Sequence, residues 1–324
     1  MTPQPDIEAI KQSLRYIVPP GRLGEVRIIR PSGSTSGFFF WHEEIEEAAQ
    51  LAAELDPQSK GVYVALNEIN PAILNGRETL TVLFGDLTKD ENILRRWKLL
   101  IDCDPKSAER GADDSSTDDE KAPSYIVREA IYEFLAELGF PEPAFCDSGN
   151  GVHMLFAVDL PNDEESKLLV QSLLNALAKR FSTDQVGVDT GVYNASRITK
   201  AYGTVARKGQ DRPDRPHRLS KILSVPDGGA EIVSKELIVK AIRELTGTAG
   251  VTLPEREQST DDEPSSLIGN LGDFTLTKPK LILPEQFPEG GRHANLIAVA
   301  GAARSFGSNE VEILEILRTF NRTR

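Results

Sequence analysis

The sequence contains very little cysteine. Cys103 and Cys146 are the only two in 324 residues, which is too few for a disulfide framework. Their flanks lack the paired cysteine and histidine spacing of a zinc site. These absences exclude a disulfide-rich secreted protein and a zinc module, and they predict a reduced, cytoplasmic setting.

Long hydrophobic runs are also lacking. No apolar stretch approaches the length that crosses a membrane, so no membrane partner is expected. The first residues, Met1 to Asp6, have neither the basic flank nor the apolar core of a signal peptide. The composition is that of an ordinary globular protein, and the length allows one large core or two domains.

Positive charge is in deficit overall, since 37 basic residues face 50 acidic ones and the net charge is −13. This sum argues at first against a nucleic-acid partner, but the distribution matters more. Residues 102–120 are strongly acidic, whereas residues 197–221 hold only Asp211 and Asp214 against eight basic residues: Arg197, Lys200, Arg207, Lys208, Arg212, Arg215, Arg218 and Lys221. An acidic centre beside a basic strip suits a metal with polyphosphate or nucleic acid, and a solvated charged surface is the alternative.

The strongest chemical pattern is an Asp-x-Asp at the end of an apolar run. Residues 99–101 are apolar, Asp102 and Asp104 follow, and Pro105 ends the segment, which predicts a buried strand. Side chains alternate across a strand, so both carboxylates should share one face. Mg²⁺ is held by one or two carboxylates with phosphate oxygens, so the pair predicts a metal half-site. A solvated, turn-forming strand end is the other interpretation.

The order of elements around this pair predicts an α+β fold with a mixed sheet. Capping-box patterns at Thr88, Thr117 and Asn162 predict three helix starts, and Gly139 is placed to end the second of these helices. The predicted helices cover 7–15, 43–55, 88 to about 97, 117–138, 162–181, 234–245, 292–306 and 308–320. The predicted strands cover 26–29, 38–41, 61–67, about 97–104, 144–146, 154–158 and 186–189.

Residues 148–153, Ser-Gly-Asn-Gly-Val-His, form a glycine-rich turn entering a strand. Glycines let backbone amides approach an anion, and Ser148 and His153 can add donors to phosphate oxygens. A tight hairpin with one satisfied histidine is the alternative. Asp189 ends a later strand and is a candidate third carboxylate, and Arg197 and Lys200 are spaced to bind one triphosphate on a helical turn or loop.

Together these motifs resemble the archaeo-eukaryotic primase superfamily, and most closely its phage- and plasmid-type primase-polymerases. Residues 97–105, 148–153 and 188–189 look like its three motifs in order. Further matches are residues 64–67, 90–93, 194–197, 203–209 and 212–218, and residues 291–295 with 300–301 look like the start of a helical C-terminal region. The resemblance implies a catalytic core on an RNA-recognition-motif-like sheet with an added N-terminal α/β unit. It places a catalytic domain at 1–232, a helix and linker at 233–288, and the start of an all-helical domain at 289–324, which the chain's end at Arg324 would cut short.

The resemblance implies template-dependent nucleotidyl transfer by two metal ions in DNA replication of a phage, plasmid or other mobile element. Its partners would be a single-stranded DNA template, a primer strand, NTP or dNTP, and a helicase, either separate or fused. Asp102, Asp104 and Asp189 would hold Mg²⁺ or Mn²⁺, and His153 would join them in catalysis. The nucleotide would be bound by Ser148, Gly149, Asn150, His153, Arg197 and Lys200, and nucleic acid by Lys208, Arg215 and Arg218, with Arg207 and Arg212 as weaker candidates.

Two rival classes remain open. One is a non-catalytic replication initiator or single-stranded-DNA-binding protein, and the other is a metal-dependent phosphohydrolase or nuclease using the same carboxylates. The sequence departs from the family by placing Cys103 between the carboxylates, and it has no zinc cysteines and no following helicase. Cys103 should face away from the carboxylates.

Overall fold

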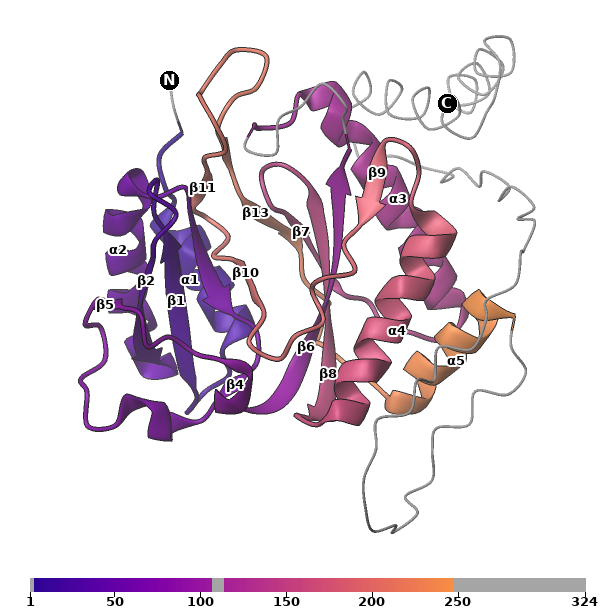
Figure 1. Cartoon of the computed structure of the whole chain (residues 1–324), viewed down its shortest axis with the longest axis horizontal. Helices are drawn as coiled ribbons and strands as arrows, with labels where there is room; N and C mark the ends of the chain where they lie inside the picture. Colours follow the sequence, from indigo (N-terminus) through magenta and orange to yellow (C-terminus); the bar gives the residue numbers. More distant parts are fainter. Residues whose placement is uncertain (1–2, 107–113, 248–324) are drawn as a thin grey trace, which may run out of the picture. The chain divides into compact units, whose positions relative to one another are not determined.

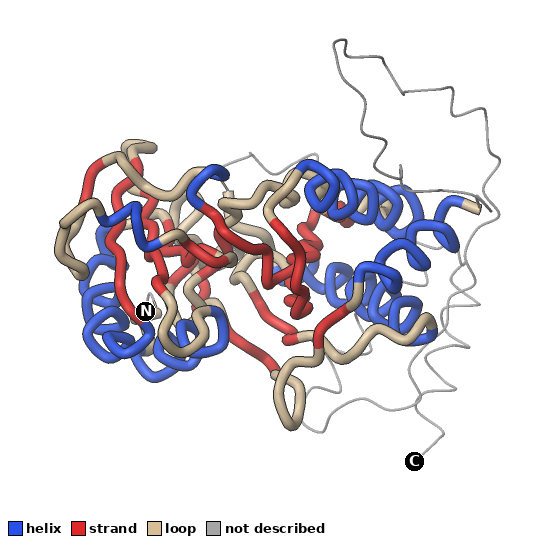
Figure 2. The backbone as a smooth tube through the Cα atoms, turned by 90° about the horizontal axis from the view of Figure 1, so that it is seen from below, coloured by secondary structure: helices blue, strands red, loops and turns tan. Residues whose placement is uncertain are grey.

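Two β-sheets with helices packed on them make up the part of the chain that the computed structural model describes, residues 3–106 and 114–247 (Figure 1). A five-stranded sheet has the order β10-β3-β1-β2-β5, and a seven-stranded sheet follows the path β13-β7-β8-β6-β4, with β9 on β6 and β14 on β8. Strands lie in the middle of the unit with helices at both ends (Figure 2). A separate two-stranded ribbon pairs β11 (Val205–Ala206) with β12 (Arg218–Leu219).

The five-stranded sheet grows from an antiparallel hairpin of β1 (Leu23–Ile29) and β2 (Thr35–Trp41). β3 (Gly61–Ala65) pairs with β1, β10 (Ile198–Lys200) with β3, and β5 (Leu83–Phe84) with β2. Alternate side chains such as Val26, Ile28 and Val64 are buried in one core with residues of α1 (Ile7–Ile17) and α2 (Ile45–Leu55). Asp6 caps α1 by accepting from the Ala9 amide at 3.1 Å. The predicted helices and strands of residues 7–65 are confirmed.

The seven-stranded sheet is built on β6 (Ile93–Pro105). Along the chain come β6, α3 (Asp118–Glu137), β7 (Ala144–Asp147), β8 (Val152–Pro161), α4 (Glu164–Phe181) and β9 (Val186–Val188). The four strands lie in the order β9-β6-β8-β7, and each adjacent pair is antiparallel. This is the predicted strand, helix, strand, strand, helix, strand order, the connectivity of a split βαβ unit.

Shorter strands complete this sheet: β4 (Glu68–Ile69), β13 (Lys221–Ser224) and β14 (Ile232–Val233). β14 runs parallel to β8, whereas the other pairings are antiparallel, so the described sheet is mixed, as predicted. The capping box at Thr117 is confirmed, because Thr117 Oγ1 accepts from the Glu120 amide at 3.1 Å and Glu120 Oε2 accepts from the Thr117 amide at 2.9 Å. Gly139 follows the helix with a φ of 101°, a conformation that favours glycine.

The helix predicted from Thr88 is wrong. Only a single 3₁₀ turn, Asp90–Asn92, precedes β6, since tertiary contacts take the groups that a helix start would use. The Thr88 amide donates to the buried Glu25 carboxylate at 2.6 Å, and Asp90 accepts from Ser196. The predicted start of α4 is off by one residue, because Asp163 rather than Asn162 accepts from the Ser166 amide.

The helix predicted at 234–245 is confirmed as α5 (Lys235–Thr246). Its Ile238, Ala241 and Ile242 are buried in the common core, and the compact unit extends to Leu245. The helix assigned to the 233–288 segment therefore packs as part of the first unit. The rest of that segment and the helices predicted at 292–306 and 308–320 lie outside the described residues. In the part of the chain that the structure describes, no helix is long and apolar enough to span a membrane.

Candidate active site

The three predicted carboxylates lie on β6 and at the end of β9, the strand that pairs with it. Asp102 and Asp104 alternate with the fully buried Ile101 and Cys103 along β6, so both carboxylates leave the same face of the sheet. The Asp189 amide donates to the Asp102 carbonyl at 2.9 Å, which extends the β6–β9 pairing by one residue. Directly opposite residues of an antiparallel pair share a face, so Asp189 stands across from Asp102.

Gly151 makes room for one of these carboxylates. A β-carbon at Gly151 would overlap Asp104 Oδ1 and come within 2.8 Å of the Cys103 carbonyl oxygen. The second glycine of the 148–153 motif is therefore required by the carboxylate on the neighbouring strand. This requirement is independent of any anion at the turn.

A Gly151→Ala substitution is expected to displace the Asp104 carboxylate and to destabilise the fold by about 1 to 3 kcal/mol. Thermal unfolding and Mn²⁺ affinity measure the two effects. Gly191→Ala is the milder comparison, because its β-carbon would lie 3.1 Å from Asp189 Oδ1, a tight contact that a small shift of that carboxylate can relieve. If Gly151→Ala left both the thermal stability and the Mn²⁺ affinity at their wild-type values, the position of the Asp104 carboxylate would not depend on the space beside Gly151.

His153 links the carboxylates to a buried hydroxyl pair. Its Nδ1 lies 2.7 Å from the Tyr202 hydroxyl and 3.2 Å from Thr199 Oγ1, while Nε2 lies 3.4 Å from Asp102 Oδ1. Burial alone would lower the pKa of His153, but the charges of Asp102, Asp104 and Asp147 outweigh it and the pKa is raised. These hydroxyl partners could not be predicted from the sequence, because Tyr202 is 49 residues away from His153 along the chain.

The donor set of this site suits a divalent cation. Asp102 Oδ1 is buried with His153 Nε2 3.4 Å away, and all three predicted ligands are carboxylates, the donors that Mg²⁺ and Mn²⁺ prefer. Across residues 3–106 and 114–247, no three acidic, histidine or cysteine side chains are already grouped closely enough to hold a metal. A cation bound by these carboxylates would need further oxygens, which a bound phosphate can supply.

Arg197 lies in the loop of residues 189–197, which runs from β9 to β10, one strand from each sheet. Its Nη2 donates to the Gly191 carbonyl at 2.7 Å, and its Nε donates to Asn194 Oδ1 at 2.8 Å. Burial lowers the pKa of Arg197, against the opposing charges of Asp189 and Asp102. The guanidinium therefore adds positive charge next to the carboxylates while it braces its own loop.

Lys200 is separated from Arg197. Arg197 ends the 189–197 loop, whereas Lys200 is the last residue of β10, so the two residues do not share one helical turn. Lys200 is 6% exposed, and its Nζ has no hydrogen-bond partner and lies 4.6 Å from the centre of the Tyr63 ring. Burial lowers the pKa of this amine to about 7, with Asp56 opposing the change.

Tyr63 lies beside Lys200, and the sequence motifs did not single it out. It pairs with Lys200 across β3 and β10. Burial raises the pKa of its hydroxyl, and the nearby charges of Asp104 and Asp102 raise it further. The alternation of β3 could have pointed to Tyr63. Because Val62 and Val64 on either side of it are buried in the core, the Tyr63 ring must lie on the opposite face of the sheet.

The glycine-rich turn uses its amides internally. The Ser148 amide donates to the Gly151 carbonyl at 3.1 Å, the Gly149 amide to Asp147 Oδ1 at 2.7 Å, and the Gly151 amide to Ser148 Oγ at 2.9 Å. Asn150 Oδ1 accepts from the Ser116 amide at 3.0 Å. The hairpin alternative thus accounts for these contacts, and nucleotide binding by Ser148, Gly149 and Asn150 stays a prediction.

Most arginines of the basic strip are paired within the chain. Arg215 forms a two-pronged ion pair with Glu120, at 2.7 and 2.8 Å, and Arg218 pairs with Asp118 at 2.7 Å. Arg207 pairs with the buried Asp56 at 2.7 Å, and Arg212 lies 3.6 Å from Asp114 and from Asp214. Arg215 and Arg218 thus hold the start of α3, whereas Lys208 is half-exposed on the same segment.

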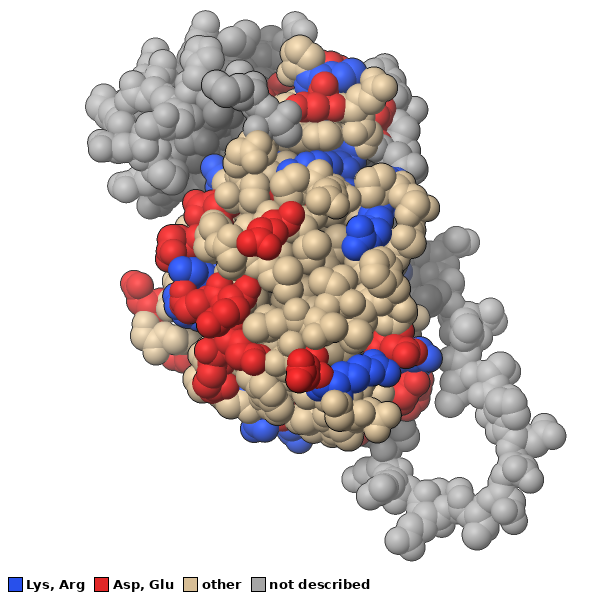
Figure 3. All heavy atoms as spheres, turned by 90° about the vertical axis from the view of Figure 1, so that its left-hand side faces the viewer, with Lys and Arg blue, Asp and Glu red and all other residues tan. Residues whose placement is uncertain are grey.

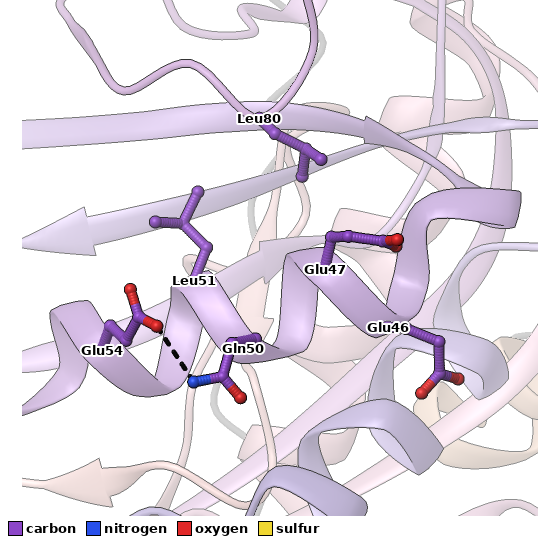
Figure 4. Close-up of a pocket in the computed structure, with 6 residues that line it drawn as sticks. All are labelled: Glu46, Glu47, Gln50, Leu51, Glu54 and Leu80. Carbon is purple, nitrogen blue, oxygen red and sulfur yellow. Dashed lines mark hydrogen bonds between the residues drawn. The ribbon is translucent and has the colours of Figure 1, made fainter.

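A groove of about 460 Å³ lies on α2, away from the carboxylates. Glu46, Glu47, Gln50, Leu51, Glu54 and Leu80 line it (Figure 4). Acidic side chains gather on the face of the molecule that carries α2 (Figure 3). This charge repels phosphate groups, so the groove is a poor nucleic-acid site.

None of the family models compared with the sequence matches it, and neither does any curated protein. Among solved structures, primase RepB′ is 12% identical with a TM-score of 0.44, over 74% of this chain and 63% of that one. The catalytic domain of primase RepB′ with initiator DNA is 12% identical with a TM-score of 0.42, over 74% and 95%. The polymerase domain of Mycobacterium tuberculosis ligase D with DNA is 14% identical with a TM-score of 0.38, over 74% and 88%. All three are primases or polymerase domains, the class that the motifs resemble; the function of this chain is inferred from the residues of its site.

Proposed function

We propose that the chain is a template-dependent nucleotidyltransferase, a DNA primase-polymerase. The observation that carries the proposal is the backbone pairing that places Asp102 and Asp189 opposite each other on β6 and β9, with Asp104 on the same face of β6 and His153 Nε2 3.4 Å from Asp102 Oδ1. Carboxylates on one face of a sheet are suited to a divalent cation. A mobile-element setting and a helicase partner remain predictions from the resemblance.

Asp102, Asp104 and Asp189 would hold Mg²⁺ or Mn²⁺. The bound ions would supply charge neutralisation at the departing pyrophosphate and activation of the attacking 3′-hydroxyl. Arg197 adds a fixed positive charge near Asp102 and Asp189, which limits their mutual repulsion before a cation arrives.

His153 and Lys200 are the best-supported phosphate-binding groups. Tyr202 and Thr199 fix the orientation of the imidazole at Nδ1, so Nε2 points toward the carboxylate face. Lys200 holds a buried amine without a hydrogen-bond partner beside Tyr63, and the negative charge of a bound triphosphate would favour its protonated form. The half-exposed Lys208 lies on the strip and would contact the template or primer backbone, and Arg215 and Arg218 would support it from their ion pairs.

We also propose that the seven-stranded sheet is the RNA-recognition-motif-like core of the superfamily. Its support is the strand order β9-β6-β8-β7 with α3 and α4 as the two connections. The five-stranded sheet with α1 and α2 would then be the added N-terminal unit.

A non-catalytic single-stranded-DNA-binding protein is the second candidate. It is favoured by the finding that the described carboxylates, histidines and cysteines form no ready three-group metal site. A phosphohydrolase is a weaker alternative, and no separate observation supports it.

A primer-extension assay on single-stranded DNA, with Mg²⁺ or Mn²⁺ and with and without a primer, tests the proposal. Metal-dependent strand growth is the expected result, and the primer-free lane shows whether the chain also starts strands. Nucleotide or strand hydrolysis without growth would move the hydrolase to the front. Salt-sensitive DNA binding with no chemistry would favour the binding protein.

A further inference from the structure

The loop of residues 189–197 carries Asp189 at one end and Arg197 at the other, and side chains from outside it hold its middle. Arg96 Nη1 donates to the Tyr193 carbonyl at 2.6 Å, and Asn67 Nδ2 donates to the Ala195 carbonyl at 2.8 Å. Asp90 Oδ1 accepts from both the amide and the hydroxyl of Ser196, each at 2.7 Å.

Asn67 ties this loop directly to the carboxylate strand. It is 4% exposed, and its Oδ1 accepts from the Trp97 and Lys98 amides of β6 at 3.0 and 3.3 Å. One amide side chain thus bonds the strand of Asp102 and Asp104 on one side and the loop of Asp189 on the other. Buried amides that are bonded at both ends fix the geometry of the segments they join.

The contacts within the loop continue this bracing. Arg197 bridges the Gly191 carbonyl and Asn194, and the Gly191 amide donates to Asp189 Oδ1 at 2.7 Å. A path of hydrogen bonds therefore leads from the Ser196–Asp90 contact through Asn194 and Arg197 to the Asp189 carboxylate. Residues 64–67 and 90–93 stood out in the sequence without a role, and the loop supplies one for Asn67 and Asp90.

We propose that Asn67, Asp90 and Arg96 are positioning residues that hold the 189–197 loop so that Asp189 faces Asp102 for cation binding. The inference rests on the proposed function, in which Asp189 holds a divalent cation. None of the three needs to touch the substrate. Residues that orient metal ligands affect metal affinity by about tenfold to a hundredfold when they are removed.

Asp90 gives the sharpest test because it is exposed, so its replacement should leave the fold intact. Asp90→Ala removes the acceptor for Ser196, whereas Asp90→Asn keeps an oxygen that can accept both hydrogen bonds. Asp159→Ala is the matched control, since it removes an exposed aspartate that pairs with Arg95 on the neighbouring strand at 2.6 Å. Mn²⁺ binding to the protein without nucleotide is measured by electron paramagnetic resonance.

Asp90→Ala is expected to weaken Mn²⁺ binding about tenfold, while Asp90→Asn and Asp159→Ala bind as the wild type does. Ser196→Ala should have a smaller effect, and in the double variant the two losses should not add, because both remove the same contact. The inference would be overturned if Asp90→Ala bound Mn²⁺ with wild-type affinity. It would also be overturned if Asp90→Asn lost as much Mn²⁺ affinity as Asp90→Ala. A wild-type protein that binds Mn²⁺ with this pattern but makes no strand would refute the polymerase proposal and leave the positioning role standing.

Discussion

Nucleotide incorporation is expected to fall at least about a thousandfold when Asp102 and Asp104 are both replaced by alanine. Two ligands of the proposed cation site are lost, and metal stabilisation of the transition state is worth several kcal/mol, about 4 of which correspond to a thousandfold. Primer extension with Mn²⁺ over a range of concentrations measures the change. High Mn²⁺ should not restore the rate, because no carboxylate remains on β6 to share the ion.

The fold should survive this double substitution. Both carboxylates lie on the half-buried face of β6, and the core positions between and before them, Cys103 and Ile101, are untouched. The midpoint of thermal unfolding is expected to stay within about 4 °C of the wild type, which corresponds to roughly 1 kcal/mol for a unit of this size. Asp159→Ala serves again as the control. Retained metal-dependent incorporation in the double variant would remove these carboxylates from the chemistry.

Lys200→Met is expected to change stability and function in opposite directions. The buried, unpartnered amine costs folding free energy, so methionine should stabilise the folded state by on the order of 3 kcal/mol at neutral pH. The same change removes the positive charge proposed for the triphosphate, and a loss of about a hundredfold in kcat/KM for the nucleotide is expected. A merely structural lysine would predict the stabilisation without the kinetic loss.

The pH dependence of stability gives an independent check on Lys200. Burial lowers its pKa to about 7 in the folded chain, below the ordinary value of 10.5. The unfolded chain therefore binds more protons between these two values, and this lysine makes wild-type stability rise with pH across that window. The cost of burying the charged lysine is complete below pH 7. The difference in unfolding free energy between Lys200→Met and the wild type, measured with urea, should therefore be largest at about pH 6 and smallest at about pH 10. An equal difference in unfolding free energy at both pH values would show that the stabilisation comes from packing and not from the loss of charge.

Local sequence chemistry predicted much of the fold. Thr117 with Glu120, and Gly139 after the helix, mark α3 correctly because both ends are decided by residues close in the chain. The alternation at 99–104 placed both aspartates on one face for the same reason. The helix predicted from Thr88 is wrong because the Thr88 amide donates to Glu25, which is 63 residues away. No local sequence pattern reveals such a partner.

The candidate site divides in the same way. Asp102, Asp104, Asp189 and His153 could be predicted because each sits at a strand end with a recognisable motif. Tyr202, Tyr63 and Asn67 could not, since their roles come from contacts across the two sheets. Arg197 and Lys200 were expected to act together on a helical turn or loop, but Arg197 braces the 189–197 loop whereas Lys200 is buried on β10 against Tyr63.

The internal ion pairs of the basic strip bear on how long the protein stays on a template. Arg207, Arg215 and Arg218 are held by Asp56, Glu120 and Asp118, so few of the strip's charges are available to replace counterions along a strand. Affinity for nucleic acid that rests on few phosphate contacts is low and depends weakly on salt. The proposed polymerase is therefore expected to have low processivity: it would add a short run of nucleotides and dissociate, which suits the making of starting segments better than the copying of long templates.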